Sequence, residues 1–220
     1  MKTYFHRDAL EYQQYYEGND IEEIRRKLRR RNDWNTYTSV LDALFKNDDT
    51  IDSAIDIGCG IGNVLFELVW RKKFATIVGV DFLRETMRIP HEQPRYFGSV
   101  QFLQGDVVHL PFTEKSFDLT ICFNMLHHIY EDDVPKALEE LARITKKYLL
   151  VEIRNKDNVL EPWYENRSLR KKYSQLPQYP LSLSEVQHIL GYQGFTRERI
   201  KGRLPATWMC RRLVCVYIRR

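Results

Sequence analysis

Three alternating glycines, Gly58, Gly60 and Gly62, follow Asp56 at the end of a short apolar run. Glycine lets the backbone approach a ligand closely and adopt angles that a side chain would hinder. An apolar-periodic segment begins at Val64, so the pattern predicts a buried strand, a tight turn and the start of a helix. The unpaired N–H groups of a helix start offer polar contacts. These residues predict a turn that cradles a small polar ligand.

Three further strand-like runs end in polar side chains, at Asp81, Asp106 and Asn124. Because the carboxyl ends of parallel strands meet at one edge of a sheet, we expect these side chains to converge with Asp56. An acid at the end of the second strand, as Asp81 is, suits the hydroxyls of a ribose. The glycine spacing is G-x-G-x-G, whereas the dinucleotide fingerprint is G-x-G-x-x-G, which disfavours a nicotinamide cofactor.

In the order of these features, from about Asp52 to Ile153, the chain resembles the class I S-adenosylmethionine (SAM)-dependent methyltransferases, in particular those that act on small molecules. The resemblance implies an α/β fold with a Rossmann-like, seven-stranded, mostly parallel sheet that ends in an antiparallel hairpin. Helices are expected on both faces. It also implies a helical cap at residues 1–46 and a SAM-binding domain at 47–220, with a lid or insert at 154–181, all forming one compact unit.

The second helix of the expected cap is predicted from Asp33 to Phe45. Its apolar positions are expected to be buried, and they are Trp34, Tyr37, Leu41 and Leu44. In the family that the chain resembles, helices ahead of the first strand often cover the substrate pocket. Packing of this helix on the rest of the domain is an equally good interpretation.

The resemblance also assigns the cofactor, SAM, and its product, S-adenosylhomocysteine (SAH), to particular residues. The backbone of the glycine turn, which includes Cys59, is expected to approach the amino-acid tail, with Asp56 reaching its ammonium. Asp81 is expected to accept hydrogen bonds from both ribose hydroxyls. The adenine is expected to lie near Asp106, Val107 and Phe82, and the sulfonium near Asn124.

Two histidines, His127 and His128, follow the fourth expected strand, where the acceptor should meet the methyl group. A hydroxyl acceptor needs a base, and an imidazole with an ordinary pKa of about 6.5 can serve near neutral pH. His128 is the preferred candidate, because a histidine at this place recurs in the small-molecule enzymes that the segment resembles. Either histidine can instead orient the loop by hydrogen bonding.

Charge and cysteine content narrow the classes of function. Residues 154–220 carry fourteen Lys and Arg against five Asp and Glu, whereas residues 51–153 carry eleven against fifteen. A basic C-terminal third suits an anionic or aromatic acceptor, but also a solvated surface. The four cysteines show no C-x-x-C spacing, so we expect reduced thiols and no metal site. No apolar run spans a bilayer and no secretory signal is visible, which favours a cytoplasmic protein.

Two basic segments keep a second class of substrate open. Residues 25–31 hold six positive charges in seven positions, and the positive charges of residues 167–172 lie between the aromatic residues Trp163, Tyr164 and Tyr173. Both segments suit an RNA or protein substrate, although no nucleic-acid-binding module is recognisable. A non-catalytic scaffold that binds the cofactor is a third interpretation. The sequence carries no motif that identifies the methyl acceptor.

Overall fold

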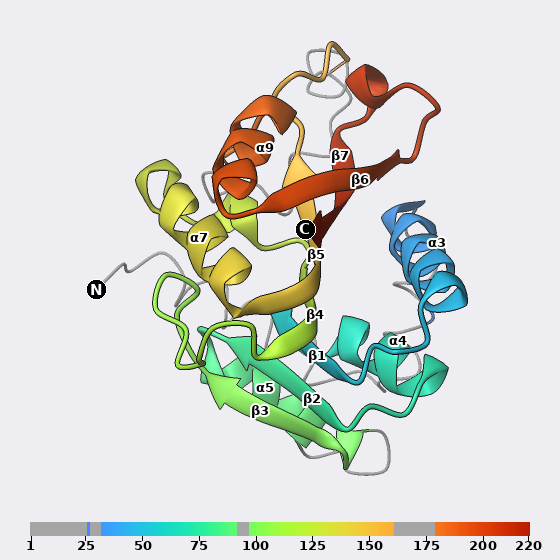
Figure 1. Cartoon of the computed structure of the whole chain (residues 1–220), viewed down its shortest axis with the longest axis vertical. Coiled ribbons are helices and arrows are strands. Elements are labelled where there is room, and N and C mark those ends of the chain that lie inside the picture. The colour runs from blue at the N-terminus through green and yellow to red at the C-terminus, as the bar shows by residue number, and fades with distance from the viewer. Residues whose placement is uncertain (1–25, 27–31, 92–96, 161–178) are drawn as a thin grey trace.

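The computed structural model describes residues 26, 32–91, 97–160 and 179–220, which build a seven-stranded sheet in the order β3-β2-β1-β4-β5-β7-β6 (Figure 1). The strands are Ser53–Ile57 (β1), Thr76–Asp81 (β2), Val100–Gln104 (β3), Phe117–Cys122 (β4), Thr145–Arg154 (β5), Phe195–Gly202 (β6) and Arg212–Arg219 (β7). Strands β1 to β5 pair in parallel, whereas β7 pairs antiparallel with β5 and with β6. The mostly parallel sheet and its terminal hairpin are therefore confirmed.

Helices cover both faces of this sheet (Figure 1). One face packs against helices α3 (Asn32–Asn47), α4 (Asn63–Arg71) and α5 (Arg84–His91). The other face packs against α7 (Val134–Ile144) and α9 (Leu183–Tyr192). Short 3-10 turns complete the described elements, and they are η1 (Leu126–His128), η2 (Glu131–Asp133) and η3 (Thr207–Met209).

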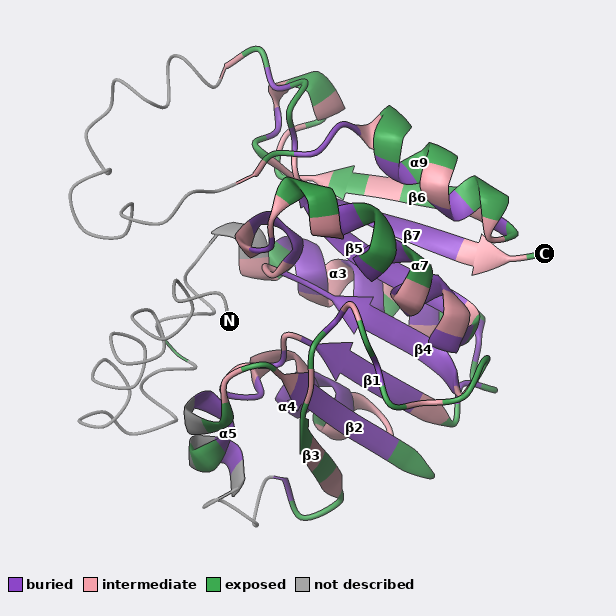
Figure 2. Cartoon of the chain, turned by 90° about the vertical axis from the view of Figure 1, so that its left-hand side faces the viewer, coloured by how far each residue is buried: buried purple, intermediate pink, exposed green. Residues whose placement is uncertain are grey.

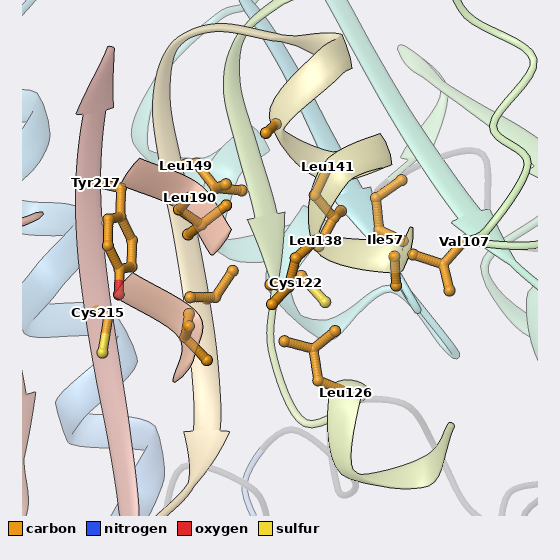
Figure 3. Packing of buried hydrophobic residues seen from close by; sticks show 14 of the residues in the cluster. Ile57, Val107, Cys122, Leu126, Leu138, Leu141, Leu149, Leu190, Cys215 and Tyr217 are labelled. Carbon is orange, nitrogen blue, oxygen red and sulfur yellow. The ribbon is translucent and has the colours of Figure 1, made fainter. Parts of the chain in front are cut away.

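The central strands are buried on both faces, as expected for parallel strands between two helical layers (Figure 2). Successive residues of a strand point to opposite faces, so Leu149 faces α7 and α9 while Leu150 faces α3 and α4. On the α7 side, Leu138 and Leu141 pack toward Cys122 and Leu149 (Figure 3). Strand β3, at one edge of the sheet, is largely exposed.

Two expected strands end earlier than the sequence pattern suggested. Strand β3 ends at Gln104 and β4 at Cys122, so Asp106 and Asn124 each lie in the loop two residues beyond their strand. Both loops leave from the carboxyl edge of the parallel strands, next to the glycine turn after β1. The expected convergence on one edge thus holds, with loops rather than strands carrying two of the four side chains.

Only part of the predicted N-terminal cap falls within the described residues, namely Arg26 and α3. Helix α3 contacts β6 and β7, and it buries Tyr37, Leu41 and Leu44, whereas Trp34 is half-buried. Most of the predicted insert at 154–181 lies outside the described residues, so the domain boundaries stay a prediction. Among the helices of the described part, none is long and apolar enough to cross a membrane.

Candidate functional site

The glycine turn between β1 and α4 is built by positive backbone angles. Gly58, Gly60 and Gly62 have φ values of 76°, 50° and 78°, which glycine adopts without steric cost. The N–H groups of Gly58 and Cys59 donate to the carbonyl of Val80, at 2.8 and 3.0 Å, and fasten the turn to the end of β2. Gly62 then begins α4 in the left-handed conformation without a side-chain cap. The predicted strand, turn and helix start are confirmed.

The surroundings of two glycines show which side of the turn is packed. A Cβ on Gly58 would lie 2.5 Å from Cγ of Met125, so this glycine allows the loop after β4 to pack against the turn. A Cβ on Gly60 would meet no atom of the described residues within 4 Å. The turn therefore has a packed side at Gly58 and an open side at Gly60, where a ligand can approach the backbone.

Asp56 stands directly before the turn, and its side chain is only 2% exposed. Its Oδ2 is buried and has no hydrogen-bond partner in the described part of the chain. Burial, and then the nearby charge of Asp81, raise the pKa of Asp56 to about 8. A buried carboxylate is costly unless a donor or a cation satisfies it. An ammonium group, such as that of SAM, is a partner that fits this orphaned oxygen.

Asp81, the last residue of β2, faces the same turn. Its Oδ2 accepts a hydrogen bond from the Gly60 N–H at 2.7 Å, and its Oδ1 accepts one from the Leu83 N–H at 2.9 Å. Burial raises the pKa of Asp81, and these N–H donors partly oppose that rise. The neighbouring Phe82 is 42% exposed. A carboxylate and an exposed ring thus stand side by side at the end of β2.

Asp106 and Val107 follow β3 in a loop. Asp106 is exposed, and its Oδ1 accepts the N–H of Val108 at 3.2 Å, a local turn contact. Val107 is 7% exposed and belongs to the apolar cluster that includes Ile57, as Figure 3 shows. The two residues lie at the expected edge, with an exposed acid next to an apolar side chain.

Asn124, beyond β4, has a φ of 55°, in the left-handed region that costs a non-glycine residue roughly 1 kcal/mol and that asparagine tolerates best. Its N–H donates to Oε2 of Glu152 at 2.8 Å, and its Oδ1 accepts a hydrogen bond from Arg212. Glu152 is fully buried in β5 and also accepts from the hydroxyl of Tyr37 and, at 3.1 Å, from Arg212. Asn124 is therefore fixed by a network from three elements.

Sequence reasoning missed Glu152, Arg212 and the hydroxyl of Tyr37 as members of the site. The hydrogen bond from Tyr37 to Glu152 spans 115 residues of sequence, and no local pattern connects two positions so far apart. One signal was available, because Glu152 interrupts the otherwise apolar run 148–153. A charged residue in a strand buried on both faces needs a specific partner.

The two candidate histidines differ in their environment. His127 is 2% exposed, its Nδ1 has no partner in the described residues, and its carbonyl accepts the N–H of Tyr179 at 3.0 Å. His128 is half-buried, and the two ring centroids are 4.1 Å apart. Burial lowers the pKa of His127 to about 2, with a further contribution from His128. Burial, and then Arg212 and Arg154, lower the pKa of His128 to about 4. Both imidazoles are neutral at pH 7.

Comparison with known sequences matches residues 55–149 to a family model described as a methyltransferase domain. Over 92 residues the chain is 33% identical to malonyl-[acyl-carrier protein] O-methyltransferase from Pectobacterium atrosepticum, a match that covers 42% of this chain and 34% of that protein. Over 94 residues it is 29% identical to 2-phytyl-1,4-naphtoquinone methyltransferase from Thermosynechococcus vestitus, covering 42% and 40%. The chain thus spans at most about two fifths of the length of these relatives.

Among solved structures, the fold is similar to that of magnesium protoporphyrin IX methyltransferase from Synechocystis PCC 6803 with bound SAH. The TM-score is 0.67 at 17% sequence identity, and the match covers 84% of this chain and 82% of that one. This likeness concerns the fold, whereas the sequence match concerns the segment from β1 to β5. Together with the glycine turn and the acids at its edge, these comparisons show that residues 55–149 match a methyltransferase-domain family model and that the chain has the fold of the class I SAM-dependent methyltransferases.

Proposed function

We propose that this chain is a cytoplasmic SAM-dependent methyltransferase that transfers a methyl group to an O, N or C atom of a small-molecule acceptor by in-line displacement. The observation that carries the proposal is Asp56, a buried acid at the end of β1, next to the glycine turn, whose Oδ2 has no hydrogen-bond partner among the described residues. An acid in this position is unfavourable for the ligand-free chain and suits a cationic ligand. The curated relatives support the proposal, since two are named for methylating a malonyl group on a carrier protein and a naphthoquinone.

Each residue at the carboxyl edge takes a specific part in holding the cofactor. Asp56 pairs with its ammonium, and the backbone at Gly60 approaches its amino-acid tail. Asp81 accepts from the ribose hydroxyls, exchanging contacts with backbone N–H groups for charge-assisted bonds to the ligand. Exposed Phe82 and buried Val107 would flank the adenine, and Asp106 would accept from its amino group.

SAM supplies a methyl group on a sulfonium that is already a good leaving group. The chain's part is to orient the acceptor atom behind that methyl group, and orientation can contribute roughly 7–11 kcal/mol to lowering a barrier. Asn124, which is fixed by hydrogen bonds to Glu152 and Arg212, lies in the loop where we place the meeting of the acceptor atom and the methyl group.

His128 is the residue that we place next to the acceptor. It is half-buried and neutral at pH 7, so it can accept a hydrogen bond from an acceptor hydroxyl, whereas its pKa of about 4 makes it a much weaker proton acceptor than an ordinary imidazole. His127 is almost fully buried and holds the segment at Tyr179 through its carbonyl. We therefore favour His128 for contact with the acceptor and His127 for orienting the loop.

An RNA or protein acceptor is the alternative, and a non-catalytic scaffold is a third. The basic segments that would serve a macromolecular substrate, 25–31 and 167–172, lie outside the described residues except for Arg26. Binding to RNA that weakens steeply with salt would favour the alternative. Turnover of any small acceptor would exclude the scaffold.

Calorimetric titration with SAH, with NADH as the control ligand, tests the proposal. We expect SAH to bind and NADH not to bind. We also expect Asp81→Ala to weaken the binding of SAH by roughly 1–3 kcal/mol, the range for a lost charge-assisted hydrogen bond. A chain that prefers NADH, or that binds neither ligand, would contradict the proposal. A screen of hydroxylated aromatic and carboxylated acceptors then follows with SAM as methyl donor.

A further inference from the structure

We propose that Glu152 is a positioning residue for methyl transfer, which fixes the loop after β4 over the glycine turn, and that Tyr37 makes this loop sensitive to the placement of helix α3. The inference rests on the proposed function, since it concerns the loop that meets the methyl group. It is carried by contacts that join α3, β5, β7 and the loop after β4.

The burial of Glu152 is the first step. The residue lies in β5, between β4 and β7, on the face that α3 and α4 cover, and it is fully buried. A carboxylate in such a position persists only when donors satisfy it. Here the donors come from the hydroxyl of Tyr37, the backbone of Asn124 and the guanidinium of Arg212.

The second step is the conformation that Glu152 stabilises. Asn124 has a left-handed backbone, which a non-glycine residue does not favour by itself. Oε2 of Glu152 accepts the N–H of Asn124 at 2.8 Å and so holds that conformation. The next residue, Met125, packs over Gly58 so closely that a Cβ there would lie 2.5 Å from its Cγ. Asn124 and Met125 thus connect Glu152 to the glycine turn.

The third step concerns the side of the loop that faces the acceptor. One nitrogen of Arg212 donates both to Oε1 of Glu152 and to Oδ1 of Asn124. Arg212 also contributes to lowering the pKa of His128, so its positive charge acts on that imidazole. Glu152 therefore helps to fix both the Asn124 amide and the guanidinium of Arg212.

Tyr37 extends the network to α3. Its ring stacks on Phe123, with centroids 4.6 Å apart and planes at 17°, and its hydroxyl donates to Glu152. Phe123 immediately precedes Asn124, so α3 touches the loop both through an aromatic stack and through the buried carboxylate. Helix α3 is the described part of the segment that the sequence predicts as a cap. A shift of α3 would consequently displace the loop at the methyl group.

A simple structural role for Glu152 is the competing explanation, and a matched control separates the two. Asp118 is another well-satisfied carboxylate, 8% exposed, at the opposite edge of the sheet. Its Oδ2 accepts from the N–H groups of Asp52 and Ser53 and from the Ser53 hydroxyl. Asp118→Asn therefore perturbs a buried acid without touching the loop.

The experiment compares Glu152→Gln, Tyr37→Phe and Asp118→Asn with the unaltered chain, using SAM labelled with ¹³C in its methyl group. We expect the dissociation constant of SAM to stay within about threefold in all variants, as glutamine and phenylalanine keep the shape of each side chain. The NMR shift of the bound methyl group should change in Glu152→Gln and Tyr37→Phe, and stay at its original value in Asp118→Asn. A shift unchanged in both network variants would overturn the proposal.

Hydrogen–deuterium exchange of the peptide around Asn124 gives a readout that needs no cofactor. We expect faster exchange of that peptide in Glu152→Gln and in Tyr37→Phe, and unchanged exchange in Asp118→Asn. If the unaltered chain binds no SAM, the proposed function fails while exchange still decides whether Glu152 holds the loop. Tyr37→Phe removes a single hydroxyl, so it provides the answer even if Glu152→Gln does not fold. Equal exchange in all variants contradicts the positioning role.

Discussion

Asp56 and Glu152 are both buried carboxylates on the α3 and α4 face of the sheet, near the carboxyl ends of β1 and β5, yet their surroundings are opposite. Oδ2 of Asp56 has no partner among the described residues, and the pKa of Asp56 is raised to about 8. Glu152 accepts hydrogen bonds from Tyr37, Asn124 and Arg212. In one region the described part of the chain supplies no partner for the carboxyl oxygen, and in the other the chain itself supplies these donors.

This difference distinguishes an acid that is suited to bind a ligand from an acid that stabilises the fold, both at the same edge of the sheet. A carboxylate with a full set of donors contributes to the stability of the fold, and removing it leaves those donors unpaired. A carboxylate without donors destabilises the folded chain in its charged form and gains from any cation that reaches it. Substitution of the two acids should therefore have opposite effects on stability and on ligand binding.

The largest effect is expected from Glu152→Ala. It leaves the N–H of Asn124 and the hydroxyl of Tyr37 without their acceptor and a partly buried guanidinium without its counter-charge. We expect a loss of about 3 kcal/mol or more in the free energy of unfolding, as for other broken buried pairs. Urea unfolding followed by circular dichroism measures it. A loss below about 1 kcal/mol would show that the network does not hold the fold.

The next effect concerns Asp56→Asn, which keeps the shape of the side chain and removes its charge. We expect SAH binding to weaken by roughly 1–3 kcal/mol, since a charge-assisted bond to the ammonium is lost. Stability of the ligand-free chain should not fall, in contrast to Glu152→Ala. Calorimetry and urea unfolding on the same preparation measure both quantities. Unchanged SAH affinity would mean that the orphaned oxygen does not contact the ligand.

The pH dependence of SAH binding sharpens the same contrast. Asp56 is protonated below its raised pKa of about 8, and only its charged form pairs with an ammonium. We therefore expect the affinity of the unaltered chain for SAH to rise by up to about tenfold per pH unit as pH approaches 8 from below. Asp56→Asn should show no such rise. Titrations at pH 6, 7 and 8, with roughly equal ionic strength, decide the point.

The stability of the ligand-free chain should depend on pH in the opposite sense, since the contribution of Asp56 falls as pH rises. Asp56 titrates at about 3.8 in the unfolded chain and at about 8 in the folded chain, so the folded chain binds more protons between these values. Its contribution to stability is thus present below about pH 4 and is lost as pH rises through 8. Asp56→Asn removes this loss, and the variant should gain stability relative to the unaltered chain at higher pH. A constant difference between pH 5 and 9 would refute the raised pKa.

Much of the Asp56 region follows from the sequence, because its signals are local. An apolar run, an acid and three spaced glycines occupy residues 54–62, and the backbone angles of those glycines agree with the turn that their spacing predicts. Asp81 was placed correctly because β2 ends on it. Asp106 and Asn124 were assigned to strand ends but lie two residues beyond β3 and β4, in the loops that follow.

The Glu152 region could not be predicted in the same way. Its members are distant in sequence, with Arg212 60 residues from Glu152 and Tyr37 115 residues from it. Each residue has a plausible local role, Tyr37 as a buried helix position and Arg212 as a surface charge of the basic C-terminal third. Only the pairing of β5 with β7 and the packing of α3 bring them together. Pairing and packing of this kind depend on the whole fold, and periodicity carries no information on them.

The smallest effect is expected from Asp118→Asn, which tests whether location or mere burial distinguishes the two regions. Burial alone would raise the pKa of Asp118, but the ammonium of Lys146, at 3.0 Å, and the donors of Ser53 and Asp52 lower it to about 2. An asparagine oxygen can still accept the Ser53 and Asp52 donors. Only the pair with the exposed Lys146 is lost, so we expect a cost of about 0.5–1 kcal/mol.

The pH profile of that cost identifies its origin. A lowered pKa means that the contribution of Asp118 is present above about pH 4 and is lost as pH falls through 2. The difference between Asp118→Asn and the unaltered chain should therefore shrink in acid, as measured by urea unfolding from pH 7 down to pH 3. SAH affinity should be unaffected at every pH. If Asp118→Asn weakened SAH binding as much as Asp56→Asn, then the loss of any buried charge would weaken ligand binding. The acid beside the glycine turn would then have no specific role in binding.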